Sequence, residues 1–302
     1  MGVSGPVVRR LALASLVTNV AIVVTGGAVR LTASGLGCPT VPYCTPDSFV
    51  PTAELGAHGV IEFGNRTLTG VIGLIALATF VVMWRTRRRD LVVPAAVLLV
   101  GIPAQALLGA VTVLTGLNPY TVMGHFLVSM VLIAVAVVLW QRSREPAGPT
   151  RVVVPPPLYL LTRGLLAVTA VVLVLGTLVT GTGPHGGDPD SPRMGFELPI
   201  ISQLHANSVL LLIGLTVALY AGLRATRAPG AARRAAAVLL GVELAQGLIG
   251  YVQYFTDLPV LLVGFHLFGA CLVNVYAVRL YLSMRERVPA ADREPATALL
   301  FP

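Results

Sequence analysis

Charge is scarce in this sequence, and lysine is absent. Only 11% of the 302 residues are charged, whereas about a quarter of a typical soluble domain is charged. All 21 basic residues are arginine, 55% of the residues are hydrophobic, and the mean hydropathy is +0.83. This composition excludes an ordinary soluble domain and indicates an integral membrane protein.

Cysteine is also scarce, because three cysteines are too few for a disulfide framework. Cys38 and Cys44 lie close together in one loop, where a disulfide can form if the loop faces an oxidising compartment. A structural role and a redox role for this pair both stay open. Cys271 lies in an apolar run and is expected to be a small packing residue.

Long apolar runs are what the sequence has instead. Eight of them, each about 20 residues or more, predict eight transmembrane helices. Clusters of arginine separate alternate runs, and all of these clusters fall on one side if both termini are cytoplasmic, which is the positive-inside pattern. We therefore expect a multi-pass protein of the cell membrane with the Cys38–Cys44 loop on the extracytoplasmic side. The predicted spans cover residues near 10–30, 57–84, 91–115, 119–140, 160–181, 199–223, 234–256 and 259–283.

The net charge of +8 would suggest nucleic acid if the arginines formed one patch. Because they are divided among short loops between apolar runs, we expect membrane lipid around the protein and no nucleic-acid partner.

The sequence also contains an internal repeat. Gln105 precedes His125 by 20 residues, and Gln246 precedes His266 by the same distance. The first span ends in VTGG and the fifth in VTGT. Four spans per repeat give both repeats the same orientation, so we predict an all-α fold of two tandem four-helix bundles in parallel. The expected divisions are an N-terminal half (1–145), a cytoplasmic linker (146–157), a C-terminal half (158–287) and a disordered tail (288–302).

Three histidines lie inside apolar spans at similar depths. His125, His205 and His266 are each about six or seven residues from the outer end of their span, which corresponds to roughly 10 Å. Two histidines at equal depth on facing helices of a four-helix bundle can bind haem iron from both sides, and His205 and His266 form such a pair. The position in the first half that matches His205 is Asn65. The sequence therefore predicts one haem site in the second half and an altered one in the first.

The second span begins with an unusual polar group. His58, Glu62 and Asn65 are spaced i, i+4, i+7, which places them on one face of a helix. A carboxylate in such a span is a functional candidate by default. The alternative is a buried carboxylate that pairs with Arg66 or His58. Glu62 has no counterpart in the sixth span, where Ser202 occupies the matching position.

Several further polar residues have two interpretations each. Arg30, Arg66 and Arg193 lie near the outer surface and could bind haem propionates or lipid headgroups. Glu243 could belong to a proton path or be a satisfied internal carboxylate, and we expect His185 to be a loop residue. Gln105 and Gln246 are expected to form hydrogen bonds between helices.

Taken together, these motifs resemble the haem A synthase family of the COX15/CtaA type over nearly the whole chain. The motifs that carry the resemblance are GCPTVPYC (residues 37–44), IEFGNR (61–66), GHFLVS (124–129), QLHANS (203–208) and GFHLFGA (264–270).

The resemblance implies oxidation of the C8 methyl group of haem O to a formyl group by successive hydroxylations, which yields haem A. It implies a haem b cofactor held by His205 and His266, a substrate site in the first half with Glu62 as catalytic carboxylate, and a disulfide or redox role for Cys38 and Cys44. The farnesyl tail of haem O would lie among apolar side chains or lipid. The implied partners are the farnesyltransferase that supplies haem O and an unidentified electron acceptor, and a homo-oligomer stays open.

The chain departs from the family pattern at Asn65, where the family has a histidine three residues after the glutamate. Either His125 is the only strong axial ligand of the substrate haem, or His58 moves in as the second ligand. Two other functions stay open as well: a dihaem electron carrier that resembles cytochrome b, and a membrane haem transporter or chaperone.

Overall fold

The computed structural model describes residues 4–288 and confirms an all-α membrane protein with eight long helices. Each helix is long and apolar enough to cross a membrane. Most of the expected tail, residues 289–302, lies outside the described part of the chain. The helices are α1 (Gly5–Leu31), α2 (Gly56–Arg85), α3 (Arg89–Leu114), α4 (Pro119–Arg142), α5 (Pro156–Thr182), α6 (Leu198–Ala225), α7 (Gly230–Phe255) and α8 (Val260–Ser283).

Local sequence accounts for where several helices begin. Proline occupies the first helical positions of α1, α4, α5 and α6, where its missing N–H removes no helical hydrogen bond. Asn118 caps α4, since its side chain accepts a hydrogen bond from the backbone N–H of Tyr120 at 3.0 Å. A short 3₁₀ helix, η1 (Ala53–Leu55), leads into α2.

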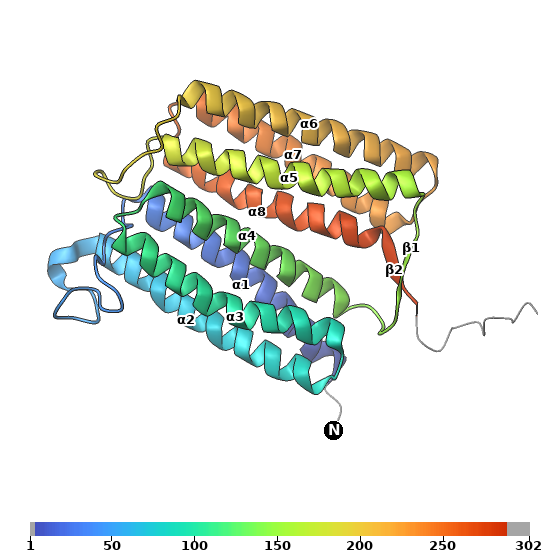
Figure 1. Cartoon of the computed structure of the whole chain (residues 1–302), viewed down its shortest axis with the longest axis horizontal. Helices are drawn as coiled ribbons and strands as arrows, with labels where there is room; N and C mark the ends of the chain where they lie inside the picture. Colours follow the sequence, from blue (N-terminus) through green and yellow to red (C-terminus); the bar gives the residue numbers. More distant parts are fainter. Residues whose placement is uncertain (1–3, 289–302) are drawn as a thin grey trace, which may run out of the picture.

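The helices form two groups of four that lie side by side (Figure 1). In the first group α1 packs against α2, α2 against α3, α3 against α4, and α4 against α1, so α2 and α4 are diagonal to each other. The second group repeats this order, and α6 and α8 are its diagonal pair. The groups meet through α1 and α4 on one side and α5 and α8 on the other.

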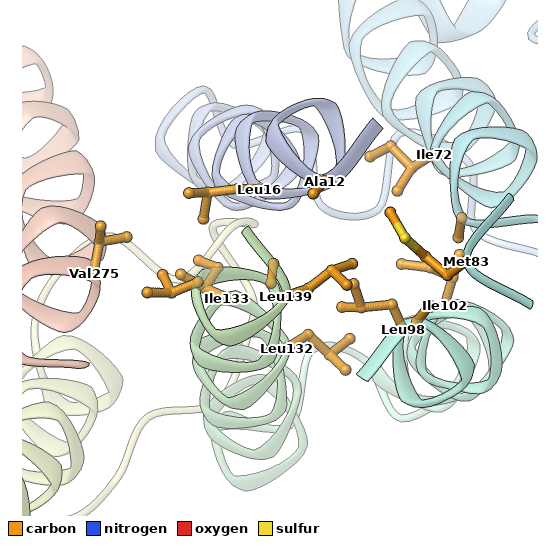
Figure 2. Packing of buried hydrophobic residues seen from close by; sticks show 14 of the residues in the cluster. Ala12, Leu16, Ile72, Met83, Leu98, Ile102, Leu132, Ile133, Leu139 and Val275 are labelled. Atoms are coloured by element: carbon orange, nitrogen blue, oxygen red, sulfur yellow. The ribbon is translucent and has the colours of Figure 1, made fainter. Parts of the chain in front are cut away.

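Each group has its own apolar core. The first is formed by α1–α4 and also takes in Cys271 and Val275 of α8. Figure 2 shows Val275 facing Leu16 of α1 and Ile133 of α4. Asn274 of α8 adds a polar contact across the same boundary, because its side-chain amide donates to the backbone carbonyl of Met130 at 2.8 Å. The two halves are therefore packed together within the membrane-spanning region.

The loops gather at the two ends of the bundle. One end, which we call the loop end, carries residues 32–52 (the disulfide loop) and 183–197 (the second loop). The opposite end, which we call the arginine-rich end, carries Arg85–Arg89, Arg142–Arg151 and Arg224–Arg234.

A short strand pair at the arginine-rich end was not predicted. Strands β1 (Thr150–Val152) and β2 (Arg285–Arg287) pair antiparallel, within the expected linker and at the end of the expected C-terminal half. The first residue of the expected tail, Val288, donates its N–H to the carbonyl of Pro149 at 3.1 Å. Three-residue strands leave no recognisable alternation in sequence, and this pair joins residues more than 130 positions apart.

Candidate functional site

The second half brings His205 of α6 and His266 of α8 together across the diagonal of its four helices. Their ring centroids are 6.4 Å apart, with the ring planes at 76°. Both residues lie about 9–10 Å along their helices from the loop end, at 1.5 Å per residue. The depth and the helix pairing therefore follow the arrangement that the sequence predicted.

The spacing of the two imidazoles fits a metal between them. An imidazole nitrogen binds a metal at about 2 Å, so two imidazoles on opposite sides of one ion have ring centroids about 6 Å apart. In both histidines Nδ1 is buried without a hydrogen-bond partner, while the side chain as a whole is only half-buried. Among the described residues, no group of three or more His, Cys, Asp or Glu could hold a metal ion. The donor set thus suits haem iron with two axial histidines better than zinc.

Glycines leave room for these rings. A Cβ at Gly176 of α5 would lie 3.2 Å from Cε1 of His205, and a Cβ at Gly250 of α7 would lie 3.4 Å from Cε1 of His266. Each histidine ring is thus flanked by a neighbouring helix that carries no side chain at that point.

The first half repeats one part of this arrangement. His125 of α4 lies against Gly109 of α3, where a Cβ would be 3.5 Å from its Cε1. Nδ1 of His125 is also buried and unpartnered. Gly109 precedes His125 by 16 residues, as Gly250 precedes His266, so the repeat extends to the contacts of the ring.

Asn65 is held by α1 in the position where a second ligand was expected. Oγ1 of Thr25 donates to Oδ1 of Asn65 at 2.8 Å. One lone pair of the side-chain oxygen is therefore engaged by Thr25, and the Nδ2 amide group is a donor, which cannot act as a metal ligand. Thr25 belongs to the VTGG motif (residues 24–27), which in the sequence alone is only a sign of the repeat.

Glu62 and Arg66 bind the disulfide loop. Oε2 of Glu62 accepts a hydrogen bond from the backbone N–H of Cys38 at 2.5 Å, and Oε1 pairs with Nη2 of Arg66 at 2.6 Å. Arg66 also donates to the carbonyl oxygens of Cys38 (2.6 Å) and Thr40 (2.8 Å). The Sγ atoms of Cys38 and Cys44 are 1.96 Å apart, at disulfide distance. Of the two interpretations of Glu62, this geometry matches the buried carboxylate paired with Arg66.

His58 continues the same contact surface. Its Nδ1 lies 2.9 Å from Oγ of Ser34, and its side chain is exposed at the loop end. Gly37 of the loop packs so closely on the backbone of His58 and Gly59 that a Cβ there would overlap the His58 carbonyl. The three residues that the spacing places on one face of α2 therefore have different partners, because His58 and Glu62 contact the disulfide loop while Asn65 contacts α1. The described contacts join neither His58 nor Glu62 to His125.

The outer arginines bind loop backbone. Arg30 of α1 donates to the carbonyls of His185 (2.6 Å) and Thr180 (2.7 Å), and Arg193 donates to the carbonyl of Pro184. His185 is a loop residue, as expected, and its Nε2 lies 2.8 Å from the carbonyl oxygen of Leu258. Burial at the loop end lowers the pKa of Arg193. Binding of propionates by Arg30 or Arg193 would therefore compete with contacts that tie the second loop down.

Glu243 lies apart from the histidines, in the middle of α7. It is 2% exposed, and Oε1 accepts a hydrogen bond from Thr216 of α6 at 2.9 Å, whereas Oε2 is buried without a partner. Cys271 is fully buried in the first core, as expected for a packing residue.

Comparisons with known proteins agree with the motifs. The family model COX15-CtaA, described as cytochrome oxidase assembly protein, matches residues 9–195, which is more than half of the chain. A protein of Bacillus cereus named Heme A synthase is 25% identical over 289 residues, covering 90% of this chain and 92% of the relative. A protein of Bacillus anthracis with the same name is 24% identical over 287 residues, with the same coverage. The resemblance noted in the sequence is thereby confirmed, and this chain belongs to the COX15-CtaA family of cytochrome oxidase assembly proteins.

Proposed function

We propose that this chain is a haem A synthase, which oxidises the C8 methyl group of haem O to a formyl group by successive hydroxylations. The observation that carries the proposal is the difference between the two halves. The second half presents two facing histidines 6.4 Å apart. The first presents one histidine opposite an asparagine whose oxygen is already engaged. One half is thus suited to hold a resident haem, and the other to hold a haem that is bound less completely and reacts.

His205 and His266 would hold haem b in the second half. When bound, haem b would supply one-electron transfer for the oxidation. The protein's own contribution is to bring the two imidazoles to a matching depth and to leave room beside each ring at Gly176 and Gly250.

In the first half, His125 would be the only histidine that binds the substrate iron. Its unpartnered ring and the adjacent Gly109 support this assignment. His58 is a poor candidate for the second ligand, because it is exposed at the loop end and its Nδ1 is engaged by Ser34. The farnesyl tail of haem O would lie among apolar side chains or lipid.

Glu62 stays the candidate catalytic carboxylate of the first half, but its present contacts keep it bound to the disulfide loop and Arg66. Both carboxylate oxygens bind the disulfide loop or Arg66. Glu62 could therefore reach a substrate only if the loop moves. While the loop stays in place, the carboxylate orders the loop and Arg66, and Arg66 is unavailable to a haem propionate.

The setting of the reaction is part of the same proposal. We place the protein in the cell membrane with both termini in the cytoplasm and the disulfide loop outside. The reason is that the arginine clusters all lie at the end opposite to this loop, and such clusters favour the cytoplasmic side. Haem O would come from a membrane farnesyltransferase, and electrons would leave to an acceptor that is not identified. An oxidising exterior suits the Cys38–Cys44 pair.

The test is co-expression of the full-length protein with a source of haem O, followed by extraction and mass analysis of the bound haems. Recovery of haem O together with haem A supports the synthase. Recovery of haem b alone from both halves would contradict it and favour a dihaem electron carrier. Haem O that is bound and never oxidised would favour a transporter or chaperone.

The cofactor assignment has its own test. His205→Ala and His266→Ala should each abolish the low-spin haem b spectrum, whereas His185→Ala, at a loop histidine, should leave it intact. An unchanged spectrum in either of the first two variants would reject the proposed haem b site.

A further inference from the structure

Gln105 of α3 is a buried polar residue that the proposed mechanism does not yet use. It is 8% exposed, and its Nε2 donates to the backbone carbonyl of His125 at 3.0 Å and to Oγ of Ser129. Ser129 in turn donates to the carbonyl of His125 at 3.0 Å. Both N–H groups of the Gln105 amide are therefore used on α4, within one turn of the proposed substrate ligand.

The oxygen of the same amide has no partner. Oε1 of Gln105 is buried, and no donor lies within hydrogen-bond distance of it. Exchanging the amide oxygen and nitrogen would set Oε1 against the carbonyl of His125, and two acceptors would then face each other. Within the described part of α1–α4, Oε1 of Gln105 and Nδ1 of His125 are the buried side-chain atoms that lack a partner. A buried acceptor without a donor is destabilising unless a ligand or a buried water supplies the donor.

The matching glutamine of the second half has different surroundings. Gln246 occupies the matching position, but it packs against Gly269 so closely that a Cβ there would overlap its side chain. The position that matches Ser129 is Ala270. No atom of Gln246 is among the buried unpartnered atoms of the described residues. Of the two matching glutamines, only Gln105 therefore has an oxygen that is both buried and unpartnered among the described residues. The buried unpartnered acceptors of the second half lie elsewhere on α7, at Glu243 and Gln253.

Haem O carries a matching donor. It differs from haem b in having a hydroxyethylfarnesyl group where haem b has a vinyl group, and that group contains one hydroxyl. Gln105 precedes Gly109 by four residues, so it lies about 6 Å along α3 from the level of the His125 ring. A substituent on the edge of a haem ligated by His125 can reach that level. A hydroxyl in an apolar interior needs a partner for the same reason that Oε1 of Gln105 does.

We propose that Oε1 of Gln105 accepts a hydrogen bond from the hydroxyl of the hydroxyethylfarnesyl group, and that this contact selects haem O over haem b in the first half. This inference rests on the proposed function, because it requires haem O to bind at His125. It makes Gln105 a specificity-determining residue and Ser129 the residue that helps to orient its amide.

The test compares the affinities of haem O and haem b for the first half. Purified full-length protein whose second half is already filled with haem b is titrated with each haem, and binding is followed by absorbance. Gln105→Met keeps a long unbranched side chain and removes the acceptor. We expect haem O to bind about five- to tenfold more weakly in this variant, which corresponds to one hydrogen bond. Haem b should bind as well as before or more tightly, since it leaves Oε1 unpartnered in the unchanged protein.

Two further variants keep the inference falsifiable. Gln246→Met, the matched change in the second half, should leave the ratio of the two affinities unchanged. Ser129→Ala introduces the residue that the second half has at the matching position, Ala270. It should lower the ratio of haem O affinity to haem b affinity by less than Gln105→Met, because the Gln105 amide loses a hydrogen-bond partner but is still present. An equal loss of affinity for both haems in Gln105→Met would show a merely structural role and overturn the inference. An unchanged ratio of the two affinities in Gln105→Met would also overturn the inference. So would a drop of this ratio in Gln246→Met as large as the drop in Gln105→Met.

Failure of the inference can be told apart from failure of the proposed function. His125→Ala should abolish binding of haem O in the first half. If haem O still binds there with equal affinity, the proposed substrate site is wrong. If binding is lost in His125→Ala while Gln105→Met leaves the ratio unchanged, only the role of Gln105 is rejected.

Discussion

Asn65 of the first half occupies the position that His205 has in the second half. It lies where the repeat places a histidine, and Thr25 engages its oxygen at 2.8 Å. An amide oxygen that already accepts this bond is a weaker iron ligand than an imidazole, so we expect His125 to be the main ligand of a haem bound in the first half. That asymmetry suits a haem that reacts better than a haem that only carries electrons.

A histidine at position 65 should give a haem bound at His125 a second histidine ligand. In a His205→Ala background, which removes the second-half signal, Asn65→His should convert haem bound at His125 to a low-spin spectrum with two histidine ligands. Thr25→Val in the same background serves as the control, because it frees the Asn65 amide without adding an imidazole. A spectrum that Asn65→His leaves unchanged would show that α2 and α4 are too far apart, or wrongly turned, to share one iron.

Removing the charge of Glu62 should loosen the disulfide loop. Glu62→Gln keeps the size of the side chain but leaves Arg66 without its ion pair and weakens the bond to the Cys38 N–H. We expect a local loss of about 1–3 kcal/mol in the free energy that holds the loop, visible as faster reduction of the Cys38–Cys44 pair by a thiol. Glu54→Gln, an exposed acidic residue at the same end, should leave the reduction rate unaltered. Equal rates in all three proteins would contradict this account of Glu62.

At the scale of elements, the histidine-bearing helices depend on their glycine-bearing neighbours. α5 and α7 each present a glycine to a ring in the second half, and α3 does so in the first. The order of helix contacts is the same in both groups, which makes α6 and α8 diagonal and sets their histidines opposite each other. A helix pair in direct contact would leave no room for a ring system between two imidazoles.

A side chain introduced at Gly176 should displace the ring of His205. Gly176→Val adds atoms where even a Cβ would lie 3.2 Å from Cε1 of His205, so we expect a marked loss of bound haem b, measured as haem per protein after purification. Gly164→Val is the matched control on α5, because nothing lies within 4 Å of a Cβ at that position. Equal haem content in the two variants would mean that α5 does not shape the site.

At the scale of the whole molecule, the two halves are joined at both ends as well as through their cores. At the loop end, the N–H of Gly35 donates to the carbonyl of Gly187 at 2.8 Å, and Arg30 binds the second loop. At the arginine-rich end, Arg287 of β2 pairs with Asp90 and Glu145 of the first half, each at 3.2 Å. Contacts at the loop end, at the arginine-rich end and between the cores therefore restrain the relative position of the two proposed haem sites.

Loss of Arg287 should weaken this connection. Its side chain is only 10% exposed, so Arg287→Ala leaves Glu145 without its arginine partner, whereas Asp90 keeps its ion pair with Arg88 at 2.8 Å. We expect a cost of about 1–3 kcal/mol and a fall of several degrees in the midpoint of thermal unfolding in detergent. Arg151→Ala removes an ion pair that is 70% and 50% exposed and should cost well under 1 kcal/mol. If the two variants unfold at the same temperature, Arg287 does not join the halves.

The sequence by itself determined the eight spans, the division into two sets of four and the depths of His125, His205 and His266. These features follow from the lengths of local apolar runs and from the constant rise of a helix. Only the tertiary structure decided which neighbour each polar face of α2 meets, that Thr25 engages Asn65, and that β2 pairs with the linker. It also decided that the side-chain oxygen of Gln105 is buried without a partner, whereas no atom of Gln246 is among the buried unpartnered atoms of the described residues. Each of these depends on how a helix is rotated against residues far away in the chain, and in a span that is apolar on nearly every side the local pattern carries little information about that rotation.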